Sequence, residues 1–324
     1  MLHVRLVSPP AETGPLVAEL AANPGVRSLV VLPGAARNPP GDAVLFDVHN
    51  ESANPVLRRL RSLPSRGDAV VMVADSGVAV DGPPTPRAER HYARRERVPV
   101  WEMVEGTIRG NTRYPLSFYL LLVIAGLIGA VGILTNSQIL VVGAMVVGPE
   151  YYAIIAAALG LSRIGRRPRD WTSVWVALRA LLFGFTAAVV VTYCFALAVR
   201  VTGAAPAAFR HGARPVAELI NSPNVFSVIT AVLAGIVGVV SLTESRANAL
   251  IGVFISVTTI PAAASLGVSL AFASWHDAVG SLLQLVLNVV LLIVVGAAGL
   301  TAQRAVWRRL AGPDQVPAEQ PGTG

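Results

Sequence analysis

The sequence predicts an α-helical polytopic membrane protein with a small α+β domain ahead of its first membrane helix. Two observations lead to this fold class. Of the 324 residues, 53% are hydrophobic and 14% are charged, whereas roughly a quarter are charged in an ordinary soluble domain. The apolar residues also gather in long runs after residue 115. This composition excludes an ordinary soluble enzyme and a disordered chain, and a single cysteine, Cys194, excludes a disulfide scaffold.

The first 81 residues are not membrane-like and alternate between strand and helix signals. Strands are expected at Leu2–Ser8, Val26–Leu32, Ala43–His49 and Asp68–Ala74, helices at Glu12–Ala22 and from Asn50 to about Leu63, and a turn at Pro33–Gly41. The order βαββαβ predicts a ferredoxin-like domain over 1–81.

Residues 82–114 are rich in proline and arginine and are predicted to be a linker that marks a domain boundary. Its segment 100–113 fits two alternatives, a solvated helix or an amphipathic helix on the membrane surface. In the second case the side chains facing lipid would be Trp101, Met103, Val104 and Ile108. At the other end of the chain, 303–324 is predicted to be a basic and then disordered tail.

The membrane domain is predicted over 115–302. Six apolar stretches lie in it: 116–134, 138–161, 172–199, 225–242, 247–273 and 278–300. Each is long enough to cross a bilayer at about 1.5 Å per residue. The loops after the first, fourth and fifth stretches are very short, so these stretches should pair as helical hairpins.

Arginine, which supplies all 26 basic residues, predicts the orientation. Arginines lie before the first stretch, in the loop 162–170 and in the tail, whereas the loops after the first and fifth stretches have none. Only the loop 200–224 departs from this pattern, because it carries arginines on the side where the other loops have none. The positive-inside rule therefore predicts a multi-pass protein of the inner membrane with both termini, and the N-terminal domain, in the cytoplasm.

Two segments of the membrane domain resemble each other. GLIGAVGILTNSQILVVGAMVVGPE begins at Gly126, and GIVGVVSLTESRANALIGVFISVTTIP begins at Gly235. Each contains a Gly-rich helix, a tight turn that begins with threonine, and a second helix with a proline, Pro149 or Pro261. One more span follows each copy, so each repeat has three spans and the second copy must be inverted. Paired Gly/Pro-interrupted helices in inverted repeats are typical of the binding sites of secondary transporters.

Both prolines are predicted to break their helices near the bilayer midplane. Glu150 follows Pro149 directly and would lie about 18 Å into a core of about 30 Å. Because a charge there costs about 2.5–3.5 kcal/mol on insertion scales, Glu150 should face the protein interior, be paired, or be protonated. The functional interpretation is a proton or cation site at the break; the structural one is a carboxyl group that only makes hydrogen bonds.

Further polar residues are candidates for the same substrate or ion site. Gly148 and Pro149 lie at the first break, and Ser256, Thr258 and Thr259 precede the second at Pro261. Ser281, Gln284 and Asn288 share one face of the sixth stretch and either line a polar path or bond to neighbouring helices. Arg179 either extends its charge to the cytoplasmic surface or pairs with Glu150.

No enzyme motif is found: HExxH, GxSxG, CxxC and a Gly-rich phosphate loop are all missing from the sequence. The chain is therefore predicted not to be an enzyme and to need no cofactor or metal. The expected partners are the lipid bilayer and an unidentified small solute or ion, with self-association left open. Nucleic acid is not expected, because the arginines flank apolar stretches.

The segments ILVVGAMVVGPE, GVFISVTTIPAAA and LLQLVLNVVLLIVVGAAGLTAQR resemble a known membrane family. This is the prokaryotic "uncharacterised hydrophobic domain" group, domain of unknown function 389. The resemblance covers roughly 115–310 and extends to the N-terminal domain. It implies a membrane fold and names no substrate. Many members have an apolar residue after the proline, where this chain has Glu150.

Two functions follow from the sequence. The favoured one is transport of a small solute or ion through a midplane site at the two helix breaks, coupled to protons or cations. The alternative is a membrane-anchored sensor or scaffold without transport activity, in which the breaks would be packed shut.

Overall fold

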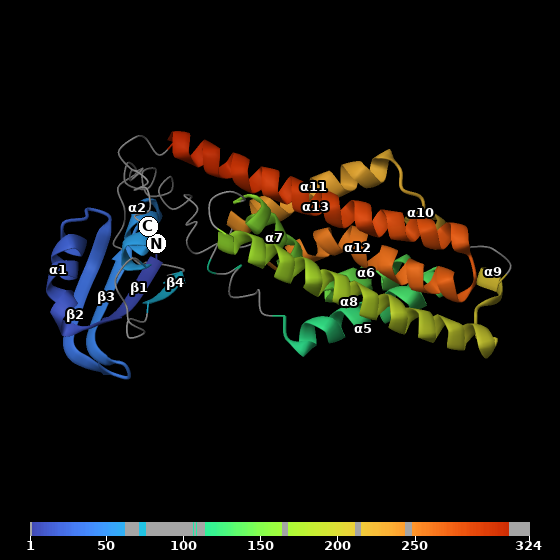
Figure 1. The fold of residues 1–324 in the computed structure, drawn as a ribbon, viewed down its shortest axis with the longest axis horizontal. Coiled ribbons are helices and arrows are strands. Elements are labelled where there is room, and N and C mark those ends of the chain that lie inside the picture. The colour runs from blue at the N-terminus through green and yellow to red at the C-terminus, as the bar shows by residue number, and fades with distance from the viewer. Residues whose placement is uncertain are drawn as a thin grey trace, which may run out of the picture. The chain divides into compact units, whose positions relative to one another are not determined.

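The structure is a computed structural model that describes residues 2–61, 71–75, 106, 108, 114–163, 168–210, 215–243 and 248–310. The chain divides into two compact units, an N-terminal one and a helical one, Thr107–Leu310. Figure 1 shows the elements of each unit.

The described part of the N-terminal unit contains four strands and two helices. They are β1 (Leu2–Ser8), α1 (Pro10–Ala21), β2 (Val26–Arg37), β3 (Pro40–Val48), α2 (Asn50–Arg61) and β4 (Val71–Asp75). The strands form one sheet in the order β2-β3-β1-β4, and each neighbouring pair is antiparallel. The predicted succession of strands and helices is confirmed.

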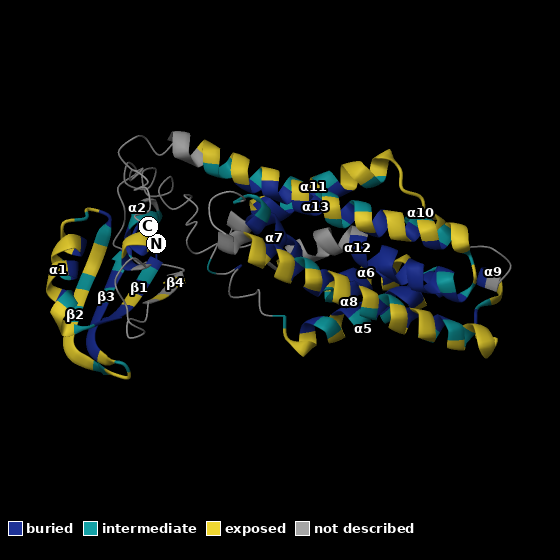
Figure 2. Ribbon diagram, viewed as in Figure 1, coloured by how far each residue is buried: buried dark blue, intermediate teal, exposed yellow. Residues whose placement is uncertain are grey.

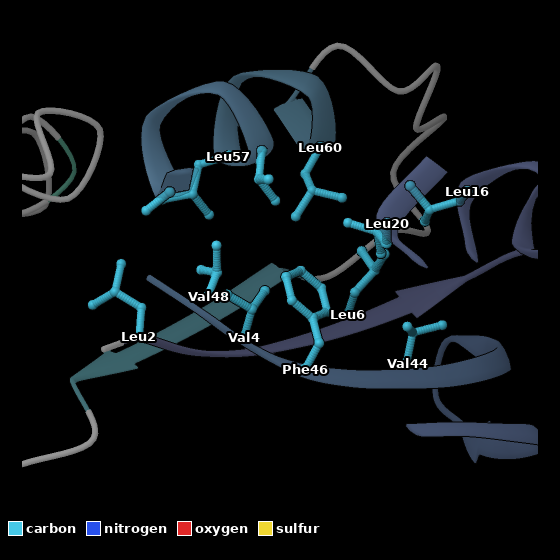
Figure 3. Close-up of a cluster of buried hydrophobic side chains, with 12 residues drawn as sticks. Leu2, Val4, Leu6, Leu16, Leu20, Val44, Phe46, Val48, Leu57 and Leu60 are labelled. Atoms are coloured by element: carbon cyan, nitrogen blue, oxygen red, sulfur yellow. The ribbon is translucent and has the colours of Figure 1, made fainter. Parts of the chain in front are cut away.

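The core of this unit lies between one face of the sheet and the two helices (Figure 3). Alternate residues of the central strands point into it, among them Val4 and Leu6 of β1 and Phe46 of β3, all 0% exposed. Leu16 and Leu57 contribute from α1 and α2, so both helices cover the same face. The period of two in the strands and the apolar stripes of the helices produce this packing.

The turn predicted over Pro33–Gly41 is present but shorter: β2 continues to Arg37, Asn38 and Pro39 form the turn, and β3 already begins at Pro40. A register shift between Leu32 and Ala36 accommodates Pro33 and Gly34. Gly34 has a φ of +62°, and its N–H donates to Asp42 Oδ1 at 2.8 Å. The physical reason is the position of β2 at the edge of the sheet, where a proline and an irregularity are tolerated.

Most of the predicted linker 82–114 and the tail after residue 310 lie outside the described residues. The same holds for Trp101, Met103 and Val104 of the expected surface helix. Ile108 is described, and it is 1% exposed. It is therefore buried within the protein and does not face lipid.

The helical unit follows the six apolar stretches closely. Its helices are α5 (Leu116–Leu134), α6 (Gln138–Val147), α7 (Tyr151–Leu161), α8 (Pro168–Val201), α9 (Ala207–Arg210), α10 (Pro215–Asn221), α11 (Val225–Thr243), α12 (Asn248–Ala271) and α13 (Trp275–Leu310). The second stretch forms two helices, α6 and α7. Two short helices, α9 and α10, lie in the loop 200–224, where none was predicted.

Several of these helices could cross a membrane. Over the described residues, three are long and apolar enough, α5, α8 and α13, and the bent pair α6 and α7 would make a fourth. The described apolar parts of α11 and α12 are shorter, Val225–Ser241 and Thr259–Ala271. The unit is therefore a bundle with three to four candidate membrane spans.

Helix α12 is the centre of the bundle. It contacts α5, α6, α7, α8, α10, α11 and α13, and every residue from Thr259 to Ser269 is buried (Figure 2). The predicted break at Pro261 is wrong, because α12 runs continuously through this proline. A proline removes only one backbone donor, and a helix surrounded by others can tolerate that loss.

Close contacts define the relative directions of the helices. Leu122 of α5 lies against Gly184 of α8, and Gly126 of α5 lies against Thr192 of α8. The contacts follow in the same order along both helices, so α5 and α8 are parallel.

Helices α11 and α13 make contacts in the same order. Gly235 of α11 lies against Val295 of α13, and Val239 of α11 lies against Gly299 of α13. These two helices also run in one direction.

Helix α12 is parallel to α8. Gly267 lies against Thr192, and the Arg200 guanidinium donates to the Ala271 carbonyl at 2.7 Å. Arg200 thus caps the C-terminal end of α12. This gives a structural role to one arginine of the loop 200–224, which did not fit the charge pattern.

Candidate functional site

The first predicted helix break is confirmed. Helix α6 ends at Val147, α7 begins at Tyr151, and the two are bent by 58°. Gly148 leaves the helical conformation with ψ 124°. Proline disfavours a helical residue before it, and a glycine, with its low helix propensity, leaves the helix at little cost.

Glu150 lies at this break and is completely buried, with 0% exposure. It occupies the N-cap position of α7, and its backbone carbonyl accepts a hydrogen bond from the Ile154 N–H at 3.0 Å. The Thr259 hydroxyl of α12 donates to Glu150 Oε1 at 2.8 Å, and Thr259 is also 0% exposed. The break therefore presents its carboxyl group to the centre of the bundle.

The residue after Glu150 links the same place to a third helix. Tyr151 is 6% exposed, and its hydroxyl lies 3.4 Å from the carbonyl oxygen of Gly238 in α11. The start of α7 is thus bonded to both α11 and α12. Sequence reasoning missed Tyr151, although a tyrosine next to a mid-membrane carboxylate is a signal for a buried polar contact.

The polar face of α13 is buried, as Ser281 and Asn288 are 0% and Gln284 is 7% exposed. The side-chain amide of Gln284 donates to Asn288 Oδ1 at 3.2 Å. The Ser281 hydroxyl instead lies 2.6 Å from Asn221 Oδ1 and 2.8 Å from the Asp277 carbonyl oxygen, so its one proton is shared between these two acceptors. The three residues share one face of the helix as predicted, and at least one of them bonds to a neighbouring helix.

The remaining predicted site residues have different positions. Arg179 is exposed on α8, whereas Glu150 is completely buried. This exposure favours the first alternative, in which Arg179 extends its charge to the surface. Pro261 lies inside α12, two residues after Thr259. The side chains of Ser256 and Thr258 lie outside the described part of the chain.

Sequence reasoning missed several buried polar residues, among them Thr192 and Asn221. Thr192 is 0% exposed and fills the narrow space between Gly126 of α5 and Gly267 of α12. Asn221 is 7% exposed and ends α10. The only advance signal for Asn221 was Gly280, whose missing Cβ allows the Asn221 backbone to approach α13, and this cannot be recognised without the fold.

The chemistry available at the break is that of oxygen ligands. A carboxyl group and a hydroxyl are present, and a broken helix also frees backbone carbonyls, which suit hard cations or protons. Within the described residues, no group of three His, Cys, Asp or Glu side chains could hold a metal ion.

The fold and this buried carboxyl group define a class of protein, a helical bundle with apolar helices long enough for a membrane and a broken helix at its centre. Residues 145–294 match the model of the family described as Domain of unknown function (DUF389). This match confirms the predicted resemblance, and the matched region includes Glu150, Thr259 and the polar face of α13. Neither the curated proteins nor the solved structures gave a match.

Proposed function

We propose that the protein transports a small solute or ion across the inner membrane through a site at Glu150, with coupling to protons or cations. One observation carries the proposal. The carboxyl group that follows Pro149 is bonded, at 2.8 Å, to the hydroxyl that precedes Pro261, although 109 residues separate them. The two proline segments that sequence similarity relates therefore meet in the middle of the bundle.

We also propose that α5 to α8 and α11 to α13 are inverted repeats that make up six spans. The directions of the helices support this. The turn Phe272–Ser274 reverses the chain between α12 and α13, which contact each other. Helix α13 is therefore antiparallel to α12, and so is α11, because α11 is parallel to α13. Because α12 runs with α8 and α5, the two Gly-rich first helices, α5 and α11, run in opposite directions.

Equivalent glycines make equivalent contacts, which is a second argument for the repeats. Gly126 of α5 lies against α8, and its counterpart Gly235 of α11 lies against α13. Gly129 of α5 approaches Ala264 of α12. The carbonyl oxygen of its counterpart, Gly238 of α11, accepts a hydrogen bond from the hydroxyl of Tyr151 in α7. In each repeat the first helix contacts its own third helix and the second helix of the other repeat.

For the N-terminal unit we propose the ferredoxin-like fold and a cytoplasmic location, as for the C-terminus. The strand order β2-β3-β1-β4 with antiparallel neighbours supports the fold, since the split βαβ arrangement requires it. The arginine distribution supports the location. No catalytic step and no nucleic-acid partner form part of the proposal.

A second function, a membrane-anchored sensor or scaffold, is favoured by one observation. Glu150, Thr259, Ser281 and Asn288 are all 0% exposed, as expected where polar contacts only hold helices together. A transporter must open this arrangement at some stage of its cycle, whereas a scaffold keeps it packed.

The experiment that separates the two functions is a flux assay on purified protein in liposomes. The vesicles contain a pH-sensitive dye, and gradients of Na⁺, K⁺ and a panel of small solutes are applied at several pH values. We expect the wild type to show flux of at least one species. Glu150→Gln should abolish the pH or cation dependence, and Glu150→Asp should retain part of it.

The matched control is Glu218→Gln, which makes the same chemical change at an exposed position of the same unit. It should leave flux unchanged. Equal flux and equal pH dependence for the wild type and Glu150→Gln would contradict a role for Glu150 in transport. A wild type that moves none of the species would favour the scaffold.

A further inference from the structure

We propose that α10 is a movable cap on the buried polar face of α13 and that Asn221 is the latch that holds it closed. The proposal rests on the proposed function, because it describes how the path to Glu150 is closed at one end of the bundle. It also makes a statement about the structure that can be tested without any flux.

Asn221 connects three helices. It is the last residue of α10, and its Oδ1 accepts hydrogen bonds from Ser281 of α13 at 2.6 Å and from Ser265 of α12 at 2.5 Å. Both serines are 0% exposed. A single amide oxygen thus ties the end of α10 to the two helices that carry Thr259 and Asn288.

The backbone of α13 is adapted to this contact. Gly280 lies so close to the Asn221 carbonyl that a Cβ at this position would come within 2.1 Å of its oxygen. Val216 and Ala217 of α10 are also buried, in an apolar cluster with residues of α5, α6 and α12 such as Val268. Helix α10 is therefore seated in the bundle.

The position of the latch relates it to the polar face. Ser281 is the first of the three polar residues on that face, and Gln284 and Asn288 follow within two helical turns. On α12, Ser265 is six residues from Thr259, about 9 Å along the helix axis. If α10 moved away and Asn221 left Ser265 and Ser281, the end of the bundle from which these groups can be reached would therefore open.

The hydrogen bonding of Asn221 explains why the closed state can be left. Its Oδ1 accepts two bonds, but its Nδ2 is buried without a hydrogen-bond partner in the described part of the chain. Burying these two donors carries a desolvation cost that water would remove on opening. This cost lowers the free energy that is needed to leave the closed state.

The test measures access of a reagent to a cysteine beneath the cap. Cys194 is replaced by alanine, Val268→Cys is introduced at a position that is 2% exposed, and the protein is kept in detergent so that both ends are accessible. A charged methanethiosulfonate is the probe. Asn221→Ala should raise the labelling rate about tenfold, because the rate follows the population of the open state.

Two further variants make the result decisive. Ser222→Ala is the matched control, since Ser222 follows α10 directly, is exposed, and donates its hydroxyl to the Glu218 carbonyl of α10 at 3.0 Å; it should leave the rate unchanged. Ser281→Ala removes one of the two latch bonds and should raise the rate less than Asn221→Ala. It decides the question if Asn221→Ala does not fold.

Unchanged labelling in both latch variants, with the fold retained, would overturn the cap. Faster labelling without any flux in the wild type would keep the cap and favour the scaffold over transport. A change of flux in Glu150→Gln together with unchanged labelling in the latch variants would support transport and refute the cap.

Discussion

The contact between α5 and α12 can be tested by exchanging one methyl group between the two helices. A Cβ at Gly129 would lie 2.9 Å from the Cβ of Ala264 and 3.7 Å from that of Ala144. Since ordinary contacts are about 3.5–4.0 Å, Gly129→Ala must push the helices apart. The opposite change, Ala264→Gly, removes the atom that causes the collision. The double variant carries the same number of atoms as the wild type.

The free energies of unfolding follow from these contacts. Overpacking in Gly129→Ala costs about 1–3 kcal/mol, while the better helix propensity of alanine returns about 0.5–1 kcal/mol. Ala264→Gly should cost about 1–2 kcal/mol through propensity and a lost buried methyl group. In the double variant the propensity changes cancel and the gap is filled again. We therefore expect it to be more stable than the sum of the single changes by at least about 1 kcal/mol.

The assay is reversible unfolding by SDS in mixed micelles, followed by tryptophan fluorescence. Gly143→Ala is the matched control, because a Cβ there meets no atom within 4 Å; it should be neutral or stabilising by up to about 1 kcal/mol. Additive effects in the double variant would refute the packing of α5 on α12 and, with it, one contact that supports the inverted repeats.

Three other predictions follow from the architecture. A reporter fused after residue 310 should be active only in the cytoplasm, and periplasmic activity there would contradict an even number of spans. A fragment of residues 1–81 should be soluble with mixed helix and strand by circular dichroism, because the buried cluster around Phe46 is formed by this unit alone; an unfolded fragment would mean that the boundary is wrong. In native membranes Cys194, which is exposed on α8, should react with an apolar maleimide and much less with a charged thiol reagent, and equal reactivity would place this face of α8 in water.

The sequence was sufficient for the positions of nearly all helices and strands. Apolar runs and their short polar interruptions determine where membrane helices begin and end, so Leu116–Leu134 was predicted to the residue. Alternation and turn residues did the same for β1. The error in β2 arose because Pro33 and Gly34 usually signal a turn, and only the sheet order places them on an edge strand that tolerates them.

The site was partly predictable. Glu150 could be found because a carboxyl group in an apolar stretch is costly and needs an explanation. Its partner Thr259 was one of several hydroxyls near Pro261, and only the packing of α12 selects it. Asn221 lies in a polar loop whose sequence resembles any other connection, so its burial depends on contacts with α12 and α13 that local patterns do not contain.

The two prolines show most clearly what local sequence leaves open. Pro149 follows a glycine, and that glycine takes the extended conformation that proline favours before it, so the helix ends and Glu150 starts a new one. Pro261 follows Ile260, which is 0% exposed and held in a helix that neighbours surround. A break therefore needs both a proline and a residue that can leave the helix at little cost. The consequence is an asymmetric centre, in which a broken helix supplies the carboxyl group and a continuous one supplies the hydroxyl. Thr259→Val should for this reason remove the hydrogen bond to Glu150 Oε1 without moving α12.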